Sequence, residues 1–409
     1  MPNKKEMSVP TAMRILRASY FCQDFMPVIP IIILLYTQKG ITVGDFFLIQ
    51  GIFRLAAFLW EIPSGYLSDR FSRRHVLIFG AIIHTIGCFV LSLAYGFWQI
   101  VLGEALFGIA CALFSGTLEA YTYDLLKRNN TQKHFLKEMG SVSTWGATAS
   151  FLATIIGPQI YQFTGGNGPL LFWITTGFGV LQMILLCLLP ELTEVIRKKQ
   201  KNKSAFMDAI GITYNTMKNP KLRNFIIFPA LFAAFTISLF WMVQTVMDLS
   251  NVPVWLFGFY IGANHFSRIL SSRYAYKVCN KFGEKTTSML AILILTIGIT
   301  MGLIALHAPN MTTVYIAVAI MACAPAVQIL NNLQYNTLIH HDIESKERGT
   351  VLSTRAMVST LFGATMLAGI KYLYDYCGAD TTLLTMLFAT VLLLIALRHV
   401  LKYLCCTKH

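Results

Sequence analysis

The chain has 409 residues, of which 55% are hydrophobic and only 13% are charged. A soluble domain carries roughly 25% charged residues, so this composition excludes a soluble enzyme and a disordered chain. The 33 Lys and Arg residues outnumber the 19 Asp and Glu residues, which gives a formal net charge of +14. Such an excess on an apolar chain indicates a polytopic membrane protein with its bases sorted to one side, rather than a nucleic-acid-binding protein.

Twelve segments are long and apolar enough to cross a membrane as helices, which takes about 20 residues. Each segment is bounded by charged residues or by Gly, Pro and Asn. Residues 289–306 are apolar throughout, unlike the alternating strands of a membrane β-barrel. The predicted spans are 14–36, 44–68, 75–95, 97–124, 139–163, 168–189, 222–247, 252–275, 287–307, 311–337, 350–374 and 380–402.

The basic residues are distributed unevenly over the loops between these spans. If the N-terminus is cytoplasmic, the outward segments carry only Lys39 and Lys371, and Arg54, Arg268 and Arg355 lie inside spans. All other Lys and Arg residues then lie on the cytoplasmic side, as the positive-inside rule requires. We therefore predict that both termini are cytoplasmic.

The longest predicted loop, residues 191–221, divides the spans into two sets of six. It is rich in Lys and Arg, and its second part is expected to form a surface helix. We therefore predict a six-helix bundle over 1–190, a cytoplasmic linker over 191–221 and a second six-helix bundle over 222–409. The predicted fold is an all-α membrane protein with two pseudo-symmetric bundles.

A short motif recurs at equivalent positions of the two halves. The loop after span 2 reads GYLSDRFSRR over residues 65–74, and the loop after span 8 reads YKVCNKFGEK over residues 276–285. Both loops have a Phe beside a small residue, with bases on either side. Related loops at equivalent positions of two six-helix halves are typical of transporters that are built from parallel repeats.

With this motif the sequence resembles the major facilitator superfamily over nearly its whole length. The first loop is similar to the family signature G-x-L-x-D-R-x-G-R-K/R, with Ser72 in place of the second glycine, and the second loop has Asn280 in place of the acid. The resemblance implies a cytoplasmic gate in which Asp69 pairs near the start of span 11 and releases as the protein opens inward. The gate residues are then Gly65, Asp69, Arg70, Arg73, Arg74 and Arg355.

Two departures argue against the drug–proton antiporters of that family. Those members often carry an Arg early in span 4, where this chain has Glu104. The antiporter motif of span 5 is present only as Gly157-Pro158, without the following pair of glycines. Residues 60–65 and 115–121 resemble poorly characterised bacterial permeases, which implies a place in the bacterial inner membrane.

Ionisable residues inside spans are costly unless they face a cavity or a partner, so they mark functional positions. They fall in spans that line the central cavity of the resembled fold, whereas the peripheral spans carry only His84. The N-terminal half holds acids and one Arg, and the C-terminal half holds bases without an acid at depth. These residues are Asp24, Arg54, Glu61, Glu104, Glu119, His265, Arg268 and Arg355.

An arginine in a medium of low dielectric constant favours an anionic partner, so we expect the C-terminal half to bind a carboxylate or similar anion. Arg268 would bind the charge, and the acids of the N-terminal half would carry a coupling proton. The predicted substrate-binding residues are Arg268, His265, Asn331, Asn332, Gln328, Gln244, Arg54 and Tyr20. The predicted proton-coupling residues are Glu119, Asp24, Glu61 and Glu104.

The sequence therefore predicts a secondary transporter that moves a small organic solute, anionic or carboxylate-bearing, by alternating access with proton coupling. The alternative is a proton-driven exporter of amphipathic drugs or metabolites, such as a siderophore. The aromatic residues that would accept such a compound are Phe21, Phe25, Phe58, Trp145, Trp241 and Phe266. A structural alternative for the charges is that they form ion pairs, Asp24 with Arg54 and Glu119 with Arg355.

The sequence contains no phosphate-binding loop, no metal-ligand cluster and no nucleophile–base pair. We therefore expect neither enzymatic activity nor a bound cofactor or metal. The expected partners are a small-molecule substrate, a coupling proton and the lipid bilayer. We also expect a monomer that binds no nucleic acid.

Overall fold

In a computed structural model, the structure describes residues 7–192, 214–342 and 348–404. These residues are almost entirely helical, and no strand occurs among them, which confirms the predicted all-α fold. The physical reason is that lipid offers the backbone no hydrogen-bond partner, so each apolar segment satisfies its own N–H and C=O groups as a helix. Most of the predicted linker and of its surface helix lies outside the described residues.

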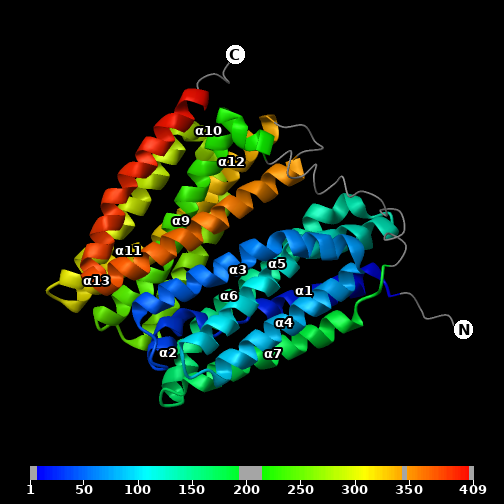
Figure 1. Ribbon diagram of the computed structural model, residues 1–409, viewed down its shortest axis with the longest axis horizontal. Coiled ribbons are helices and arrows are strands. Elements are labelled where there is room, and N and C mark those ends of the chain that lie inside the picture. The colour runs from blue at the N-terminus through cyan, green and yellow to red at the C-terminus, as the bar shows by residue number, and fades with distance from the viewer. Residues whose placement is uncertain (1–6, 193–213, 343–347, 405–409) are drawn as a thin grey trace, which may run out of the picture. The chain divides into compact units, whose positions relative to one another are not determined.

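The first part of the chain forms helices that follow the first six predicted spans (Figure 1). Span 1 is broken after Asp24, and Pro27 and Pro30 occupy the break, as expected for residues that cannot continue a helix. Asn167 caps the N-terminus of the last helix, where its side chain accepts from the Leu170 N–H at 3.2 Å. The elements are α1 (Val9–Asp24), η1 (Ile29–Ile31), α2 (Ile32–Thr37), α3 (Val43–Arg70), α4 (Arg73–Leu93), α5 (Phe97–Arg128), η2 (Gln132–His134), α6 (Phe135–Phe163) and α7 (Gly168–Leu188).

The second part of the chain follows the remaining predicted spans. Asn219 caps the first helix and Asn310 caps the third, each through its side-chain oxygen. A 3₁₀ turn that contains Pro325 interrupts span 10. The elements are α9 (Pro220–Leu249), α10 (Val254–His307), α11 (Met311–Cys323), η4 (Ala324–Val327), α12 (Gln328–Asp342) and α13 (Arg348–Leu404).

Two very long helices are each divided by one glycine. Gly283 in α10 has φ 72° and Gly378 in α13 has φ 77°, a left-handed backbone that favours a residue without Cβ. The predicted spans 8 and 9 therefore share α10, and spans 11 and 12 share α13. Within the described ranges, nine helices are long and apolar enough to cross a membrane. The count of twelve and the orientation of the termini stay predictions.

The chain divides into two compact units, residues 1–41 with 52–201 and residues 42–51 with 202–409. In the first unit, α4 packs against α5 and α7, and α1 packs against α6 and α7 (Figure 1). In the second unit, α9 packs against α13 and α10. The start of α3 groups with the second unit and the rest of α3 with the first.

Each unit has its own apolar core. In the first unit the core joins Leu16 of α1, Ala81 of α4 and Tyr121 of α5, and the Tyr121 hydroxyl donates to the Pro190 carbonyl at 2.8 Å. In the second unit α9 is buried on nearly every face, with Phe232 and Trp241 inside. A helix that is apolar on nearly every face is typical of the core of a helical unit.

Candidate functional site

Polar side chains of α1, α3 and α5 gather within the first unit. Asp24, Cys111 and Glu119 lie close enough to the Tyr20 hydroxyl to interact with it electrostatically. Arg54 lies in the same group, because both it and Asp24 interact electrostatically with Cys111. We call Tyr20, Asp24, Arg54, Cys111 and Glu119 the first polar set.

The backbone of α6 closes one side of this set. A Cβ added to Gly146 would meet the Asp24 carboxylate and come within 2.7 Å of the Tyr20 ring. The absence of a side chain at this position lets α6 approach Asp24 and Tyr20 of α1. The first polar set is therefore positioned by the close packing of α1 against α6.

The charges of the first polar set are not neutralised within their own unit. Asp24 and Arg54 are both half-buried, and neither side chain forms an ion pair or hydrogen bond with another residue in the described part of the unit. The pair between Asp24 and Arg54 that the structural alternative requires is thus not formed there. Glu119 is exposed on α5. These groups remain available to a ligand or a proton.

Glu104 belongs to a different network, although it lies on the same helix as Glu119. Its side chain is only 4% exposed and accepts a hydrogen bond from the Tyr36 hydroxyl at 2.6 Å. The Tyr36 ring stacks on Phe172 of α7, and the Lys39 ammonium lies 4.8 Å from the centre of the Phe172 ring. Glu104 thus joins α5 to α2, and it also interacts electrostatically with Cys111 of the first polar set. Glu61, the remaining predicted acid, is half-buried on α3.

The turn outside the membrane that holds Lys39 is itself well packed. The Lys39 ammonium donates to the Leu91 carbonyl at 2.6 Å, at the end of α4. Burial lowers the pKa of Lys39 from its ordinary value of 10.5 to about 8. This lysine is therefore a packed residue of the first unit and not merely an outward charge.

The signature loop is attached to its own unit by its arginines. Arg73 forms an ion pair with Asp124 at the end of α5 and donates to the Ala120 carbonyl at 2.9 Å. Arg74 donates to the Cys187 carbonyl at the end of α7. Sequence reasoning missed Asp124, although an acid at the predicted cytoplasmic end of span 4 was a usable signal.

The remaining gate residues of this loop lie at the surface. Gly65, Asp69 and Arg70 are exposed, and Arg70 donates to the Tyr66 hydroxyl at 2.5 Å. The partner implied for Asp69 lies near the start of α13, where the side chains up to residue 350 lie outside the described residues. The gate therefore stays a prediction.

Arg355 has a set of hydrogen bonds within the second unit. Its side chain is 7% exposed and donates to the Asn332 side-chain oxygen at 2.7 Å and to the side chain of Asn336. Asn332 was predicted to bind substrate and Arg355 to gate, but the structure joins them in one contact between α12 and α13. Asn336 was not predicted.

The other predicted polar residues of the second unit lie on α9, α10 and α12. Gln328 accepts from the Thr236 hydroxyl at 2.7 Å, and Gln244 is buried. Asn331 is only 1% exposed, and neither atom of its amide has a hydrogen-bond partner among the described residues. A buried amide without partners is rare, because each unmade hydrogen bond leaves the desolvation of a polar atom uncompensated.

His265 and Arg268 lie on α10 and interact electrostatically. Arg268 is exposed, and within the described part of the chain it has no ion-pair or hydrogen-bond partner. We call His265, Arg268 and Asn331 the second polar set.

A cluster of opposite charges that sequence reasoning missed lies in the second unit. The Lys371 ammonium is 2.6 Å from a carboxylate oxygen of Asp45 and 2.8 Å from one of Asp375. Gly44 allows this packing, because a Cβ there would meet the Asp375 carboxylate. The cluster holds the start of α3 to α13.

Three of the aromatic residues proposed for an exporter, Phe21, Phe25 and Trp145, form one aromatic cluster. The ring centre of Phe21 lies 5.8 Å from that of Phe25 and 6.1 Å from that of Trp145. Trp241 is buried, with its ring centre 5.2 Å from that of Phe46. Phe266, in contrast, is exposed on α10.

Apolar helices that carry polar groups at depth define a multi-pass membrane protein with the architecture of a solute transporter. The family model of the Major Facilitator Superfamily matches residues 15–367. The chain belongs to this family, which confirms the resemblance carried by the signature loop.

Several curated relatives are bacterial transporters. An uncharacterised transporter of Buchnera aphidicola is 25% identical over 176 residues, 42% of this chain and 43% of that protein. The inner membrane transport protein YajR of Escherichia coli is 29% identical over 146 residues, 34% of this chain and 29% of that protein. The matches thus span less than half the length of these relatives.

Solved structures share the fold over nearly the whole chain. The nucleoside transporter NupG has a TM-score of 0.78 at 15% identity, with 97% of this chain and 100% of that chain covered. The human organic anion transporter MFSD10 has a TM-score of 0.61 at 16% identity, with 97% and 100% covered. At these identities the likeness concerns the fold.

Proposed function

We propose that this transporter moves a small organic solute that carries a carboxylate or another anionic group, and that it couples the movement to protons. It works by alternating access, and it resides in the bacterial inner membrane like the YajR protein, whose name states that location. Family membership establishes a membrane transporter. The nature of the solute and of the coupling is the proposal.

The observation that carries the proposal is that Arg268 has no counter-ion among the described residues of its unit. The guanidinium lies on a helix inside the predicted membrane span and has no partner in the described part of the second unit. Among the described acids of that unit, Asp45 and Asp248 lie near helix ends, and Asp375 lies near the break at Gly378 in α13. Because an arginine without a counter-ion is costly in low dielectric, an anionic substrate is the ligand that suits it. Asn331, buried with an unpaired amide, supplies the neutral donor that would orient a carboxylate.

Proton coupling is assigned to the first polar set. Asp24 is half-buried without a basic partner among the described residues of its unit, and Glu119 shares an electrostatic neighbour, Tyr20, with it. Carboxyl groups are general acid–base groups, so these two side chains are the candidates for carrying the coupling proton. Glu104 is not included, because its bond with Tyr36 gives it a structural role.

The proposal is tested by uptake into proteoliposomes. A panel of radiolabelled monocarboxylates and dicarboxylates is screened first by thermal shift, since a bound substrate stabilises the fold. For the solute that binds, we expect Arg268→Gln to raise KM at least about tenfold, which corresponds to the loss of a charge-assisted hydrogen bond. Arg273→Gln, which removes an exposed base from the same helix, serves as the control.

Three outcomes would contradict the proposal. An unchanged KM in Arg268→Gln would exclude Arg268 as the anion-binding group. Concentrative uptake that survives a protonophore would exclude proton coupling. Binding restricted to uncharged amphipathic compounds would favour the exporter that the exposed Phe266 side chain suits.

A further inference from the structure

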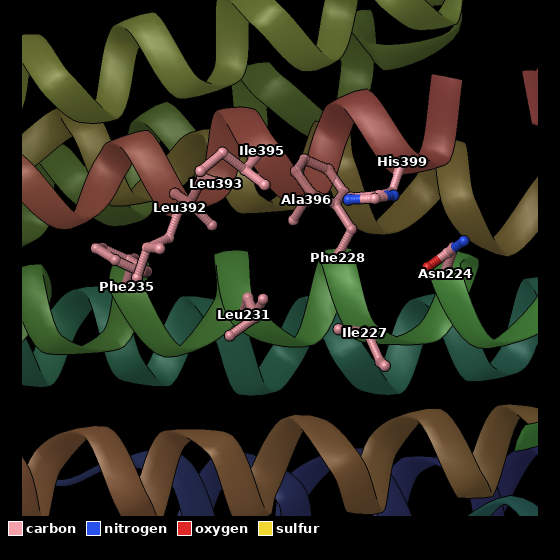
Figure 2. Close-up of a pocket in the computed structure, with 10 residues that line it drawn as sticks. All are labelled: Asn224, Ile227, Phe228, Leu231, Phe235, Leu392, Leu393, Ile395, Ala396 and His399. Carbon is pink, nitrogen blue, oxygen red and sulfur yellow. The ribbon is translucent and has the colours of Figure 1, made fainter. Parts of the chain in front are cut away.

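An apolar groove runs along the second unit between α9 and the last part of α13 (Figure 2). Its volume is about 360 Å³. Its walls are apolar side chains that include Phe228, Leu231 and Leu392, and its polar lining residues, Asn224 and His399, lie at one end. The groove is therefore amphipathic along its length.

The length of the groove along α9 is close to the thickness of one leaflet of a bilayer. Asn224 and Phe235 lie at its two ends on α9, eleven residues apart. A helix rises 1.5 Å per residue, so the groove is about 16 Å long. The hydrocarbon core of a bilayer is about 30 Å thick, and one leaflet accounts for about 15 Å of it. The polar end then lies near the headgroups and the apolar end near the middle of the membrane.

The open side of the groove faces acyl chains when the protein is in a membrane. Leu392 and Ile395 line it while 59% and 50% exposed, and the adjoining Phe388 and Val391 are also exposed. These side chains lie on a helix that is apolar enough to cross a membrane. Because the groove opens within the bilayer, a membrane lipid is the compound that reaches it.

The polar end of the groove carries a positive charge. Arg223 and Arg398, the exposed neighbours of Asn224 and His399, form no ion pair with any residue that the structure describes. Lys221 and Lys402 lie within one turn of the same end. The sequence has no Asp or Glu over residues 209–247 or 381–409, so no acid lies beside Arg223 or Arg398 in the sequence. Clusters of bases at the cytoplasmic ends of spans recognise anionic lipid headgroups.

We propose that the groove between α9 and α13 binds one anionic glycerophospholipid of the adjoining leaflet, with an acyl chain along Phe228, Leu231 and Leu392 and the phosphate between Arg223 and Arg398. By the predicted orientation this is the cytoplasmic leaflet. The site shares no lining residue with either polar set, and the proposal is independent of the substrate that the protein moves.

The test is native mass spectrometry of the full-length protein with phosphatidylglycerol or phosphatidylcholine that carry the same acyl chains. We expect phosphatidylglycerol to bind at least fivefold more tightly. The double substitution Arg223→Gln with Arg398→Gln lowers that affinity at least fivefold and leaves phosphatidylcholine unchanged. The control Lys277→Gln with Lys281→Gln removes two exposed bases of α10 and leaves both affinities unchanged.

A second pair of variants fills the groove. Ala396→Phe and Leu231→Trp each place a larger side chain in it, and both lipids then bind at least fivefold more weakly, with folding checked by thermal unfolding without lipid. Equal affinity for the two lipids, or an unchanged affinity in the double arginine variant, would overturn the proposal. A dimer mass that disappears in the groove-filling variants would assign the groove to a second copy of the chain.

Discussion

The two arginines that lie inside predicted spans of the second unit show how differently one residue type is used in different helices. Arg355 is satisfied by the side chains of Asn332 and Asn336. Arg268 has none of these contacts within the described residues and lies beside His265. From sequence both are bases inside predicted spans. A satisfied guanidinium holds helices together, whereas an unsatisfied one is available to a ligand.

Two acids of the first unit differ in the same way as these two arginines. Glu104 is buried and bonded to Tyr36, whereas Glu119 is exposed and interacts electrostatically with Tyr20. The two acids lie on the same face of α5 by their spacing in the sequence. The neighbours of each acid therefore determine its role. This interpretation is tested by comparing the free energy of unfolding and the transport activity of substituted proteins.

The largest effect on stability is expected at Arg355. Arg355→Met removes both contacts with Asn332 and Asn336 and leaves their partly buried amide oxygens without donors, so we expect the free energy of unfolding to fall by about 3 kcal/mol. Titration with sodium dodecyl sulfate measures this loss. Arg268→Met should change it by less than about 0.5 kcal/mol, because this side chain has no ion pair or hydrogen bond to lose among the described residues. Equal losses in the two variants would remove the distinction between the arginines.

The next effect concerns the acids of α5. Glu104→Leu leaves the buried Tyr36 hydroxyl without its acceptor and should cost about 2 kcal/mol of unfolding free energy. Tyr36→Phe should cost a similar amount, and the double variant less than the sum of the two, because both remove one bond. Glu119→Gln should unfold like the parent protein but lose proton-driven accumulation in proteoliposomes. Additive losses at Glu104 and Tyr36 would contradict the structural role of Glu104.

A smaller loss of unfolding free energy is expected when the cluster of Lys371, Asp45 and Asp375 is disrupted. Lys371→Gln leaves the carboxylates of Asp45 and Asp375 without their shared cation and should lower the unfolding free energy by roughly 1 to 2 kcal/mol. Adding Asp45→Asn to this variant should recover part of the loss, because it removes the repulsion. Lys277→Gln, at an exposed position of α10, is the control and should be neutral. A double variant that is less stable than Lys371→Gln alone would count against the cluster.

The smallest effect is a pH dependence at Lys39. The folded protein holds this pKa at about 8, below the ordinary 10.5, so folding releases a proton between these values. Below pH 8 the folded protein carries the full cost of burying the charged Lys39 ammonium. As the pH rises from 8 toward 10.5, the folded protein loses this proton while the unfolded chain keeps it, so the free energy of unfolding rises over this interval. Relative to Lys39→Met, the gain should be on the order of 1 kcal/mol after screening by solvent. The measurement is the unfolding free energy at pH 7.5 and 9.5, and parallel pH profiles of the two proteins would refute the shift.

Much of the fold was predictable because hydrophobicity is a local property of the chain. Prolines were also informative, since a missing N–H breaks a helix wherever it occurs, and Pro27, Pro30 and Pro325 all lie at breaks. Long-range hydrogen bonds were not predictable. Tyr36 and Glu104 are 68 positions apart in the chain, and Arg73 and Asp124 are 51 apart. No periodicity relates such partners, because they meet only when two helices pack.

The sequence by itself determined the class of protein and the approximate ends of its helices. Composition and apolar runs act additively along the chain, and lipid leaves a backbone of this kind no alternative to the helix. Only the tertiary structure decided which intramembrane charges are satisfied. It bound Arg355 to two asparagines and Glu104 to a tyrosine, and it left Asp24, Arg54 and Arg268 without ion pairs among the described residues of their units. The reason is that a hydrogen bond depends on atoms within about 3 Å, and only helix packing sets distances on that scale.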